Sequence, residues 1–367
     1  MKIYGEPYQT IWQLDETTIQ VIDQRVLPFR FKIFDLKTAK DVHHAIHDMV
    51  VRGAPLIGVA ASYGMYLAMV HAKNNDNWKE ELRNAGNYLK SARPTAVNLA
   101  YAVDQQLYKL VGTDDYEQAK NLSLEVANNL RTKEIENCRL IGEHGFPLIE
   151  KIARKKQGKP VNILTHCNAG WLACIDYGTA TAPIYNAYDK GIKVHVWVDE
   201  TRPRNQGARL TAWELQQHGV PHTVIPDNTG GLLMQKGMVD MVIVGSDRTS
   251  ARGDVANKIG TYLKALAAKE NNLPFYVALP LSSIDRNIYD GVNEIPIEQR
   301  SENEIRYIEG YDEGQIRKVR ITPAKSPVAN YGFDVTPADY VKALITEKGL
   351  CKPDETEIKK LFGDEGK

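Results

Sequence analysis

The second half of the chain repeats one pattern, in which a short apolar run is followed by a segment of helical periodicity. The apolar runs lie at residues 161–165, 194–198, 222–225, 241–244 and 275–279. Helices are expected between them, around 179–190, 210–218, 231–236 and 255–270. Strands that are apolar throughout and alternate with helices are typical of a parallel sheet covered on both faces. The pattern therefore predicts an α/β fold with a doubly wound parallel sheet.

The first half is organised differently. Two β-rich runs, 17–23 and 29–34, come before a series of helical segments, and Thr38 is the expected N-cap of the first helix. The helices are expected at 38–51, 56–72, 78–89, 97–110 and 115–152, with an interruption at Arg93-Pro94-Thr95. The segment 154–160 is charged and contains Gly and Pro, so it is expected to be a solvated linker.

A length of 367 residues fits two domains better than one. We expect residues 1–155 to form a smaller N-terminal domain of a β-meander and helices, and residues 156–367 to form the sheet domain. One segment, 53–70, has no charged residue and is about long enough to cross a bilayer. Because it contains Pro55, three glycines and several alanines, a buried helix that packs closely is the better interpretation.

Composition narrows the possible partners and compartment. Lys+Arg and Asp+Glu both total 46, so the formal net charge is zero, which argues against nucleic acid or an anionic membrane as a partner. The four cysteines form no C-x-x-C pair, which leaves neither a zinc ribbon nor a redox motif. The first residues contain an acid where a signal peptide needs an apolar stretch. The cytoplasm is the expected compartment.

Polar residues follow four of the expected strands directly. The segments that hold these polar residues begin at His166, Asp199, Pro226 and Gly245. Ligands of open α/β sheets bind beyond the carboxyl ends of the strands, so these segments are the place to look for a site. Neither G-x-G-x-x-G nor G-x-x-x-x-G-K-[ST] is present, so the signatures of dinucleotide and Walker-type nucleotide binding are missing.

Seven blocks spread over the chain carry a family resemblance. They are Arg52–Gly58, Arg93–Asn98, Thr165–Gly170, Asp199–Pro203, Gln206–Leu215, Gly253–Thr261 and Phe333–Pro337. In this order, the blocks resemble the methylthioribose-1-phosphate isomerase family from about residue 20 to residue 349. The wider superfamily also holds ribose-1,5-bisphosphate isomerases and regulatory subunits of a eukaryotic translation-factor exchange complex, so fold alone does not determine activity.

The resemblance implies an aldose–ketose isomerase of methionine salvage that converts 5-methylthioribose 1-phosphate to 5-methylthioribulose 1-phosphate. It also implies a Rossmann-like domain after a smaller helical one, a homodimer, and no metal or organic cofactor. Cys167 matches the catalytic cysteine of the family and Asp247 its catalytic acid. The matching substrate-binding positions are Arg52, Gly53, Ala54, Arg93, Gln206, Asn257 and Lys258.

The chemistry of the expected substrate gives these residues roles. A sugar with phosphate on its anomeric oxygen cannot open freely, so an acid must protonate the ring oxygen, and hydrogen must move from C2 to C1. Our hypothesis is that Asp247 is the acid and that the Cys167 thiolate relays the C2 proton. A direct hydride shift is the rival. Asn257 and Lys258 lie near the start of the expected helix 255–270, so a phosphate there would gain charge and backbone N–H donors.

Several alternatives stay open. The segments 228–231 and 250–252, with Ser246 and Thr249, depart from the family pattern and could alter the pocket for the sugar's 5-substituent. A 5-deoxyribose 1-phosphate is therefore a second candidate substrate, ahead of ribose 1,5-bisphosphate, and a non-catalytic regulatory subunit is the rival of another class. His43 and His47 have zinc-ligand spacing without the Glu of H-E-x-x-H, which favours a solvated helix face. His166 adjoins Cys167, but a structural role is favoured because neighbouring strand residues point to opposite faces.

Overall fold

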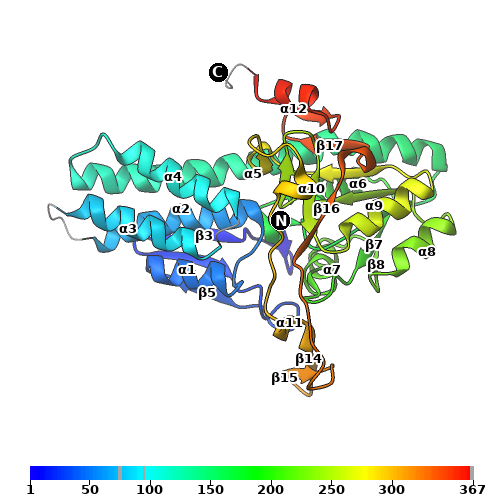
Figure 1. The fold of residues 1–367 in the computed structure, drawn as a ribbon, viewed down its shortest axis with the longest axis horizontal. Helices are drawn as coiled ribbons and strands as arrows, with labels where there is room; N and C mark the ends of the chain where they lie inside the picture. The colour runs from blue at the N-terminus through cyan, green and yellow to red at the C-terminus, as the bar shows by residue number, and fades with distance from the viewer. Residues whose placement is uncertain (73–76, 94–95, 364–367) are drawn as a thin grey trace.

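A seven-stranded sheet forms the centre of the computed structural model, which describes residues 1–72, 77–93 and 96–363 (Figure 1). From edge to edge its strands are β18 (Gly349–Cys351), β17 (Ala343–Thr346), β12 (Phe275–Ala278), β9 (Met241–Val244), β6 (Val161–Thr165), β7 (Val194–Asp199) and β8 (His222–Ile225). All neighbours pair in parallel except β18, which is antiparallel to β17. The α/β class and the dominance of parallel pairing are therefore confirmed.

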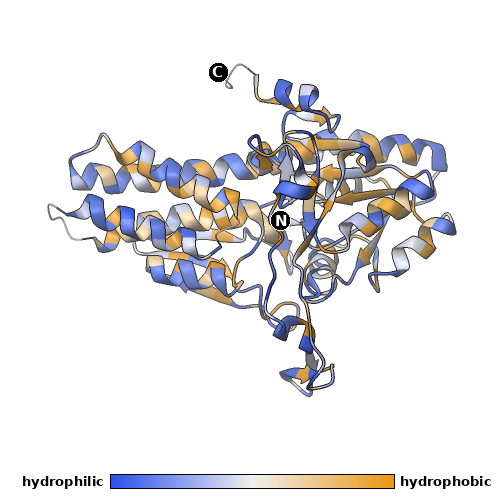
Figure 2. Ribbon diagram, viewed as in Figure 1, coloured by the Kyte–Doolittle hydropathy of each residue, from blue (hydrophilic) through white to orange (hydrophobic). Residues whose placement is uncertain are grey.

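Helices pack against both faces of this sheet. Ile163 and Ile243 share a core with Ile149 of α5 (Tyr116–Lys156) and Ile184 of α6 (Ala182–Asp189). On the other face, alternate strand residues such as Leu164 and Val242 share a core with helices α8 (Thr229–Gln235) and α9 (Thr261–Glu270). Figure 2 shows the strands in orange between bluer helices. This double burial explains why the strand residues are apolar throughout.

The first half contains a three-stranded antiparallel meander of β3 (Ile11–Asp15), β4 (Thr18–Ile22) and β5 (Ile33–Leu36). The strand expected at 29–34 begins later, because the N–H of Arg30 bonds to the carbonyl of Val26 and makes a turn there. Helix α1 (Ala39–His47) starts as predicted at Thr38, whose hydroxyl accepts from the N–H of Asp41 while that carboxylate accepts from the N–H of Thr38.

Three more helices stack beside α1 (Figure 1). They are α2 (Ala54–His71), α3 (Trp78–Ser91) and α4 (Val97–Leu110), close to the predicted ranges. Pro94 and Thr95, part of the predicted interruption, lie outside the described residues. Among the described residues, α2 is the one helix apolar and long enough to cross a membrane, and 78% of it is buried inside the molecule. The interpretation as a buried helix agrees with this burial.

Helix α5 runs for 41 residues and contacts both halves of the chain. It packs against α2 and α4 near one end and against α6 and β17 near the other. The prediction of a linker at 154–160 is wrong for its first three residues, which continue the helix to Lys156 before Gln157 turns left-handed. Basic residues in the last turn complement the helix dipole, so their charge stabilises the helix.

A second, four-stranded sheet has the order β13 (Ile284–Asp285), β10 (Arg248–Ser250), β11 (Val255–Lys258) and β16 (Phe333–Thr336). The prediction of one helix over 255–270 is wrong in its first part, because Val255–Lys258 forms strand β11. Helix α9 starts after Gly260, whose φ of 102° is left-handed. The carboxylate of Asp334 then accepts from the N–H groups of Gly260 and Tyr262 and caps the helix.

The remaining elements lie at the periphery. They are the pair β1 (Lys2–Ile3) and β2 (Glu6–Pro7), the hairpin β14 (Tyr307–Asp312) and β15 (Gln315–Arg320), helices α7 (Ala212–His218), α10 (Gly291–Glu294), α11 (Asn303–Arg306) and α12 (Glu355–Leu361), and short turns, of which Trp171–Ala173 and the π-helical Gly207–Thr211 flank the site. The β14–β15 hairpin projects away from the body of the molecule (Figure 1).

Candidate active site

Cys167 and Asp247 lie beyond the carboxyl ends of two adjacent strands, β6 and β9. Both side chains line one cavity, together with Arg52, Gly53, Ala54 and Asn257. A second cavity is lined by Arg93 and again by Gly53, Ala54 and Asp247, so the two hollows adjoin. The β6–β9 border is where the strand order reverses direction, the usual position of a ligand in such sheets.

The backbone holds Cys167 in a conformation that is uncommon for a residue with a side chain. Its φ is 66° and the residue is 6% exposed. Two threonine hydroxyls fix it, since Thr201 accepts from the Cys167 N–H at 2.9 Å and Thr211 donates to the Cys167 carbonyl at 2.7 Å. A left-handed conformation persists only where its surroundings impose it, and such residues cluster at active sites.

Arg52 is oriented by a chain of hydrogen bonds from the sheet half. Its guanidinium donates to the side-chain and backbone oxygens of Asn168 at 2.6 and 2.8 Å. The Asn168 amide donates in turn to the buried carboxylate of Glu214 at 3.0 Å. Burial raises the pKa of Glu214 to about 7, although hydrogen bonds from Asn168 and the Leu172 N–H oppose the shift.

Three cationic side chains from different elements converge on this region. Lys258 is buried on β11 with its ammonium 4.8 Å from the ring centre of Phe333. Burial lowers the pKa of Lys258, while the charges of Cys167 and Asp247 oppose that change. Arg93, whose pKa is likewise lowered by burial, is 3.6 Å from Glu298 and also senses Arg52 and Asp247. The arrangement suits a small dianion such as a phosphate ester.

The other predicted site residues differ in whether they line a cavity. Asn257 lines the cavity of Cys167 and donates to the hydroxyl of Thr261 at 3.1 Å. Gln206 is buried beside the π-helical turn that carries Thr211, but it is not among the residues that line the two cavities. Its Oε1 atom has no hydrogen-bond partner among the described residues. A buried acceptor without a donor is costly, and a substrate hydroxyl would satisfy it.

The expectation that the N-terminus of α9 offers backbone donors to the phosphate is wrong. Asn257 and Lys258 belong to strand β11, and Asp334 already accepts from the first free N–H groups of the helix. An anion near Lys258 would therefore meet side-chain charge and not the helix dipole.

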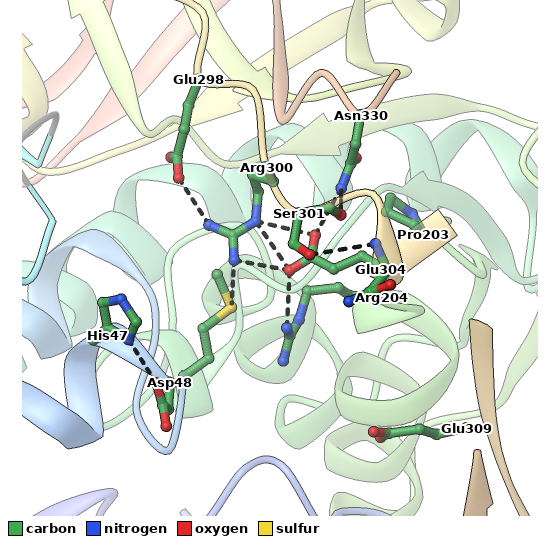
Figure 3. A network of polar contacts seen from close by, with 12 residues as sticks. His47, Asp48, Pro203, Arg204, Glu298, Arg300, Ser301, Glu304, Glu309 and Asn330 are labelled. Carbon is green, nitrogen blue, oxygen red and sulfur yellow. Dashed lines mark hydrogen bonds and ion pairs between the residues drawn. The ribbon is translucent and has the colours of Figure 1, made fainter. Parts of the chain in front are cut away.

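Arg300 was not identified from the sequence and belongs to the same electrostatic cluster. The positive charge of Arg300 lowers the pKa of both Lys258 and Arg93. Figure 3 shows its guanidinium between Glu298 and Glu304, at 2.9 Å from each. Burial opposes ionisation of Glu304, but its bonds and charge pairing with Arg300 lower its pKa to about 2. The segment around Arg300 mixes charges of both signs without periodicity, so no sequence signal distinguished it from a solvated surface.

The histidines stay apart from the thiol. His166 bonds through its two ring nitrogens to Asp199 and to the carbonyl of Ile259. His43 and His47 stack on the exposed face of α1, with ring centres 6.0 Å apart. Both placements agree with the structural interpretations.

Comparison with known proteins gives this geometry a context. The model of the initiation factor 2 subunit family matches residues 50–353. A methylthioribose-1-phosphate isomerase from Desulfatibacillum aliphaticivorans is 56% identical over 369 residues and is covered, like this chain, to 100%. A second, from Desulfosudis oleivorans, is 54% identical over 358 residues, 97% of each chain.

Two solved structures are similar over almost the whole chain. The 5-methylthioribose 1-phosphate isomerase of Pyrococcus horikoshii OT3 has a TM-score of 0.83 and 38% identity, with 99% of both chains covered. A structure described as the delta subunit of translation initiation factor eIF-2B from A. fulgidus has a TM-score of 0.80 and 37% identity, covering 97% of this chain and 99% of that one. The chain thus belongs to the initiation factor 2 subunit family and, within it, to the methylthioribose-1-phosphate isomerases.

Proposed function

We propose that this protein is the aldose–ketose isomerase that converts 5-methylthioribose 1-phosphate to 5-methylthioribulose 1-phosphate in methionine salvage. The observation that carries the proposal is that Cys167 and Asp247 line one cavity with Arg52, at the ends of adjacent strands. The full-length relatives that carry this activity in their names support it.

The proposed reaction needs one acid and one base. Asp247 gives a proton to the ring oxygen as the bond from C1 to that oxygen breaks. The Cys167 thiolate takes the proton from C2, whose electron pair forms a double bond to C1. The proton returns from the thiol to C1, and the C2 hydroxyl gives its proton back to Asp247, which leaves a ketone at C2. The substrate receives two protons and gives up two, so the product is an isomer and both side chains are regenerated.

Binding residues come from both halves of the chain. We assign the phosphate to the cationic region of Arg52, Arg93 and Lys258, since Arg93 and Lys258 both sense the charge of Arg52. Gln206 would accept from a sugar hydroxyl through its unpartnered Oε1 atom. Fixed guanidinium and ammonium donors, held by partners before substrate arrives, bind a phosphate without reorganisation.

The second cavity supports an apolar 5-substituent. Its lining combines the apolar Ile57, Val97, Ile295 and Phe333 with the charged Arg93, Asp247 and Arg248. A methylthio group would be buried there. Of the unusual segments, residues 228–231 lie at the start of α8, and a Cβ added to Gly230 would meet Leu164 at 2.9 Å. Gly230 therefore serves packing of α8 against the sheet, whereas Ser246 does line the cavity of Cys167.

A substrate panel tests the proposal. The purified protein is given the 1-phosphates of 5-methylthioribose and 5-deoxyribose, and ribose 1,5-bisphosphate, and ketose formation is followed for each. We expect the highest kcat/KM with the methylthio sugar, and a difference of about 1–3 kcal/mol in transition-state binding from the deoxy sugar, because one apolar pocket separates such neighbours weakly. Preference for the bisphosphate would contradict the substrate assignment. No turnover of any sugar, together with binding to a translation GTPase, would favour the regulatory-subunit alternative.

Substitution of the two reactive groups gives a direct prediction. Cys167→Ser and Asp247→Asn should each lower kcat by about 10²–10⁴, the usual effect of losing an acid–base group. Cys351→Ser is a matched control, because Cys351 is also a buried free thiol but lies on the edge strand β18. Near-normal turnover in either active-site variant would remove that residue from the mechanism.

Heavy water distinguishes the proton relay from a hydride shift. We expect deuterium at C1 of the ketose, because the proton that the thiol takes from C2 exchanges with solvent before it is delivered to C1. Product without deuterium would favour direct hydride transfer or a fully shielded proton.

We further propose that residues 1–155 and 156–367 are separate domains, the second Rossmann-like, and that the protein is a cytoplasmic homodimer needing no metal or organic cofactor. The strand order, in which β6, β7 and β8 run to one side and β9, β12 and β17 to the other, supports the second assignment. Analytical ultracentrifugation tests the dimer, and full activity after exhaustive dialysis against a chelator is the outcome expected without a metal.

A further inference from the structure

His166 lies directly before Cys167, and each of its ring nitrogens is within hydrogen-bond distance of an oxygen atom. It is 1% exposed. Its Nδ1 atom is 2.8 Å from Oδ2 of Asp199, and its Nε2 atom is 2.9 Å from the carbonyl oxygen of Ile259. A backbone carbonyl has no proton to give. A neutral imidazole carries one N–H, so it could donate to only one of these oxygens.

The state of Asp199 determines which ring form fits. A protonated Asp199 could donate to a neutral ring, but the same Oδ2 atom is 3.2 Å from the ammonium of Lys264. That contact favours an ionised carboxylate, which is a pure acceptor. With both partners accepting, each ring nitrogen has to carry a proton. We propose that His166 is held as an imidazolium and acts as a positioning residue for Cys167 and Lys258.

The other charged groups around the ring fit a buried cation. Asp227 is 3.9 Å from Nδ1, and the Asp334 carboxylate senses the charges of both His166 and Lys264. The carboxylates of Asp199, Asp227 and Asp334 thus lie around two cations, the His166 ring and the Lys264 ammonium. His166, Asp199 and Asp227 also have ligand atoms within 4.8 Å of one another, as in metal sites. Lys264 already supplies positive charge there, and the Asp227 oxygens accept from the N–H groups of Thr201 and Arg202.

The doubly donating ring connects three segments that carry site residues. The backbone of His166 follows strand β6 directly and leads to Cys167. Its bond to Asp199 reaches the end of β7, and its bond to Ile259 reaches the residue after Lys258. A ring with one N–H would release one of these links. The positioning role rests on the proposed function, whereas the charge of the ring does not.

Ring ¹⁵N spectroscopy on the full protein tests the charge. Two-bond ¹H–¹⁵N correlations distinguish an imidazolium, with two protonated nitrogens, from a neutral ring with one bare nitrogen. The chain has nine histidines, and the signal missing in His166→Gln identifies the residue. If that variant does not fold, substituting the other eight in turn identifies it by elimination. We expect the imidazolium pattern in the wild-type protein at pH 7.5. A bare nitrogen at that pH, which includes the case of a protonated Asp199, would overturn the proposal.

Kinetics tests the positioning role. We expect His166→Gln and Asp199→Asn each to lower kcat for the methylthio sugar more than ten-fold, and Asp199→Asn to change the His166 signal to the neutral pattern. His195→Gln is the matched control, since His195 lies on β7 and its Nε2 atom is 3.0 Å from the hydroxyl of Thr223, which suits either tautomer. Unchanged kcat in a folded His166→Gln variant would refute positioning. A wild-type protein without isomerase activity would refute the proposed function instead, while the spectrum would still report the charge.

Discussion

Glu214 is a buried carboxyl group that organises the loop after Cys167. It accepts from the Asn168 amide, from the N–H groups of Trp171 and Leu172, and from the Tyr185 hydroxyl. The loop approaches so closely that a Cβ on Gly170 would lie 1.7 Å from the carboxylate. Through Asn168, the group also sets the position of Arg52. One side chain outside the cavities thereby controls two that line them.

The raised pKa of Glu214 gives a prediction for stability. Since its pKa is about 7 in the folded protein and near 4.5 when unfolded, the native state binds the proton more tightly. The stabilisation of the folded state that comes from this proton is therefore fully present below about pH 4.5 and is lost as pH rises through 7. In total it amounts to about 3 kcal/mol in the free energy of unfolding. We expect the free energy of unfolding, measured with urea from pH 5 to 8, to fall less steeply in Glu214→Gln than in the wild type.

The free energy of unfolding of Glu214→Gln still falls with pH, because burial and the charge of Glu347 raise the pKa of Glu134 to about 7 as well. The comparison is therefore between two slopes. Equal slopes in the two proteins would mean that Glu214 does not titrate in this range.

At the residue level, sequence reasoning succeeded where a motif fixes chemistry and location together. Cys167 and Asp247 meet at one cavity, as the strand ends indicated, and Arg52 and Asn257, which the family resemblance named, also line it. Glu214 lay inside a recognised block, but nothing in the linear pattern showed that it faces loop 168–172. Arg300 was missed because its importance comes from burial among charges that are distant in sequence.

At the scale of elements, helix α2 meets the site through Gly53. This residue is the N-cap of α2, with a φ of 96°, and a Cβ there would lie 2.3 Å from the carbonyl oxygen of Ala173. The close approach brings Arg52 to Asn168. Only glycine combines this conformation with this contact.

Gly53→Ala should therefore damage both packing and activity. We expect the free energy of unfolding to fall by about 1–3 kcal/mol, from left-handed strain and overpacking, and kcat/KM to fall more than ten-fold as Arg52 moves. Gly112→Ala is the control, because a Cβ there meets nothing within 4 Å. Urea unfolding and initial rates measure the two effects. Wild-type values for Gly53→Ala would show that the contact with Ala173 relaxes freely.

Among the elements, long apolar patterns were predictable and short antiparallel strands were not. Five strands of the main sheet (β6, β7, β8, β9 and β12) and helix α4 were placed correctly, because burial on both faces or one face sets their residue pattern, whereas β17 and β18 were not predicted. Strands β10, β11 and β16 are three or four residues long and carry site residues such as Lys258. Their pairing depends on partners up to about 80 residues away, which periodicity does not register.

For the whole molecule, α5 is the element that packs against both proposed domains. Its residue Gly145 faces α6 so closely that a Cβ would lie 2.4 Å from Cγ of Pro183. We expect Gly145→Ala to lower the free energy of opening by about 1–3 kcal/mol equally in α2 and in β6, because both depend on α5. Native-state hydrogen exchange with mass spectrometry measures both segments, and Gly310→Ala in the exposed hairpin is the control. A loss confined to β6 would show that the halves open independently.

The adjacency of β6 and β9 has a consequence for how the enzyme regains function after denaturation. The two strands are separated along the chain by β7, β8 and the helices between them, and their register pairs Leu164 with Val242. The Cys167 thiol and the Asp247 carboxyl meet only once that long loop has closed, and closing a long loop is slow. Recovery of turnover on dilution from urea should therefore lag behind the return of helical circular dichroism. The rate at which turnover returns would then report the last stage of refolding.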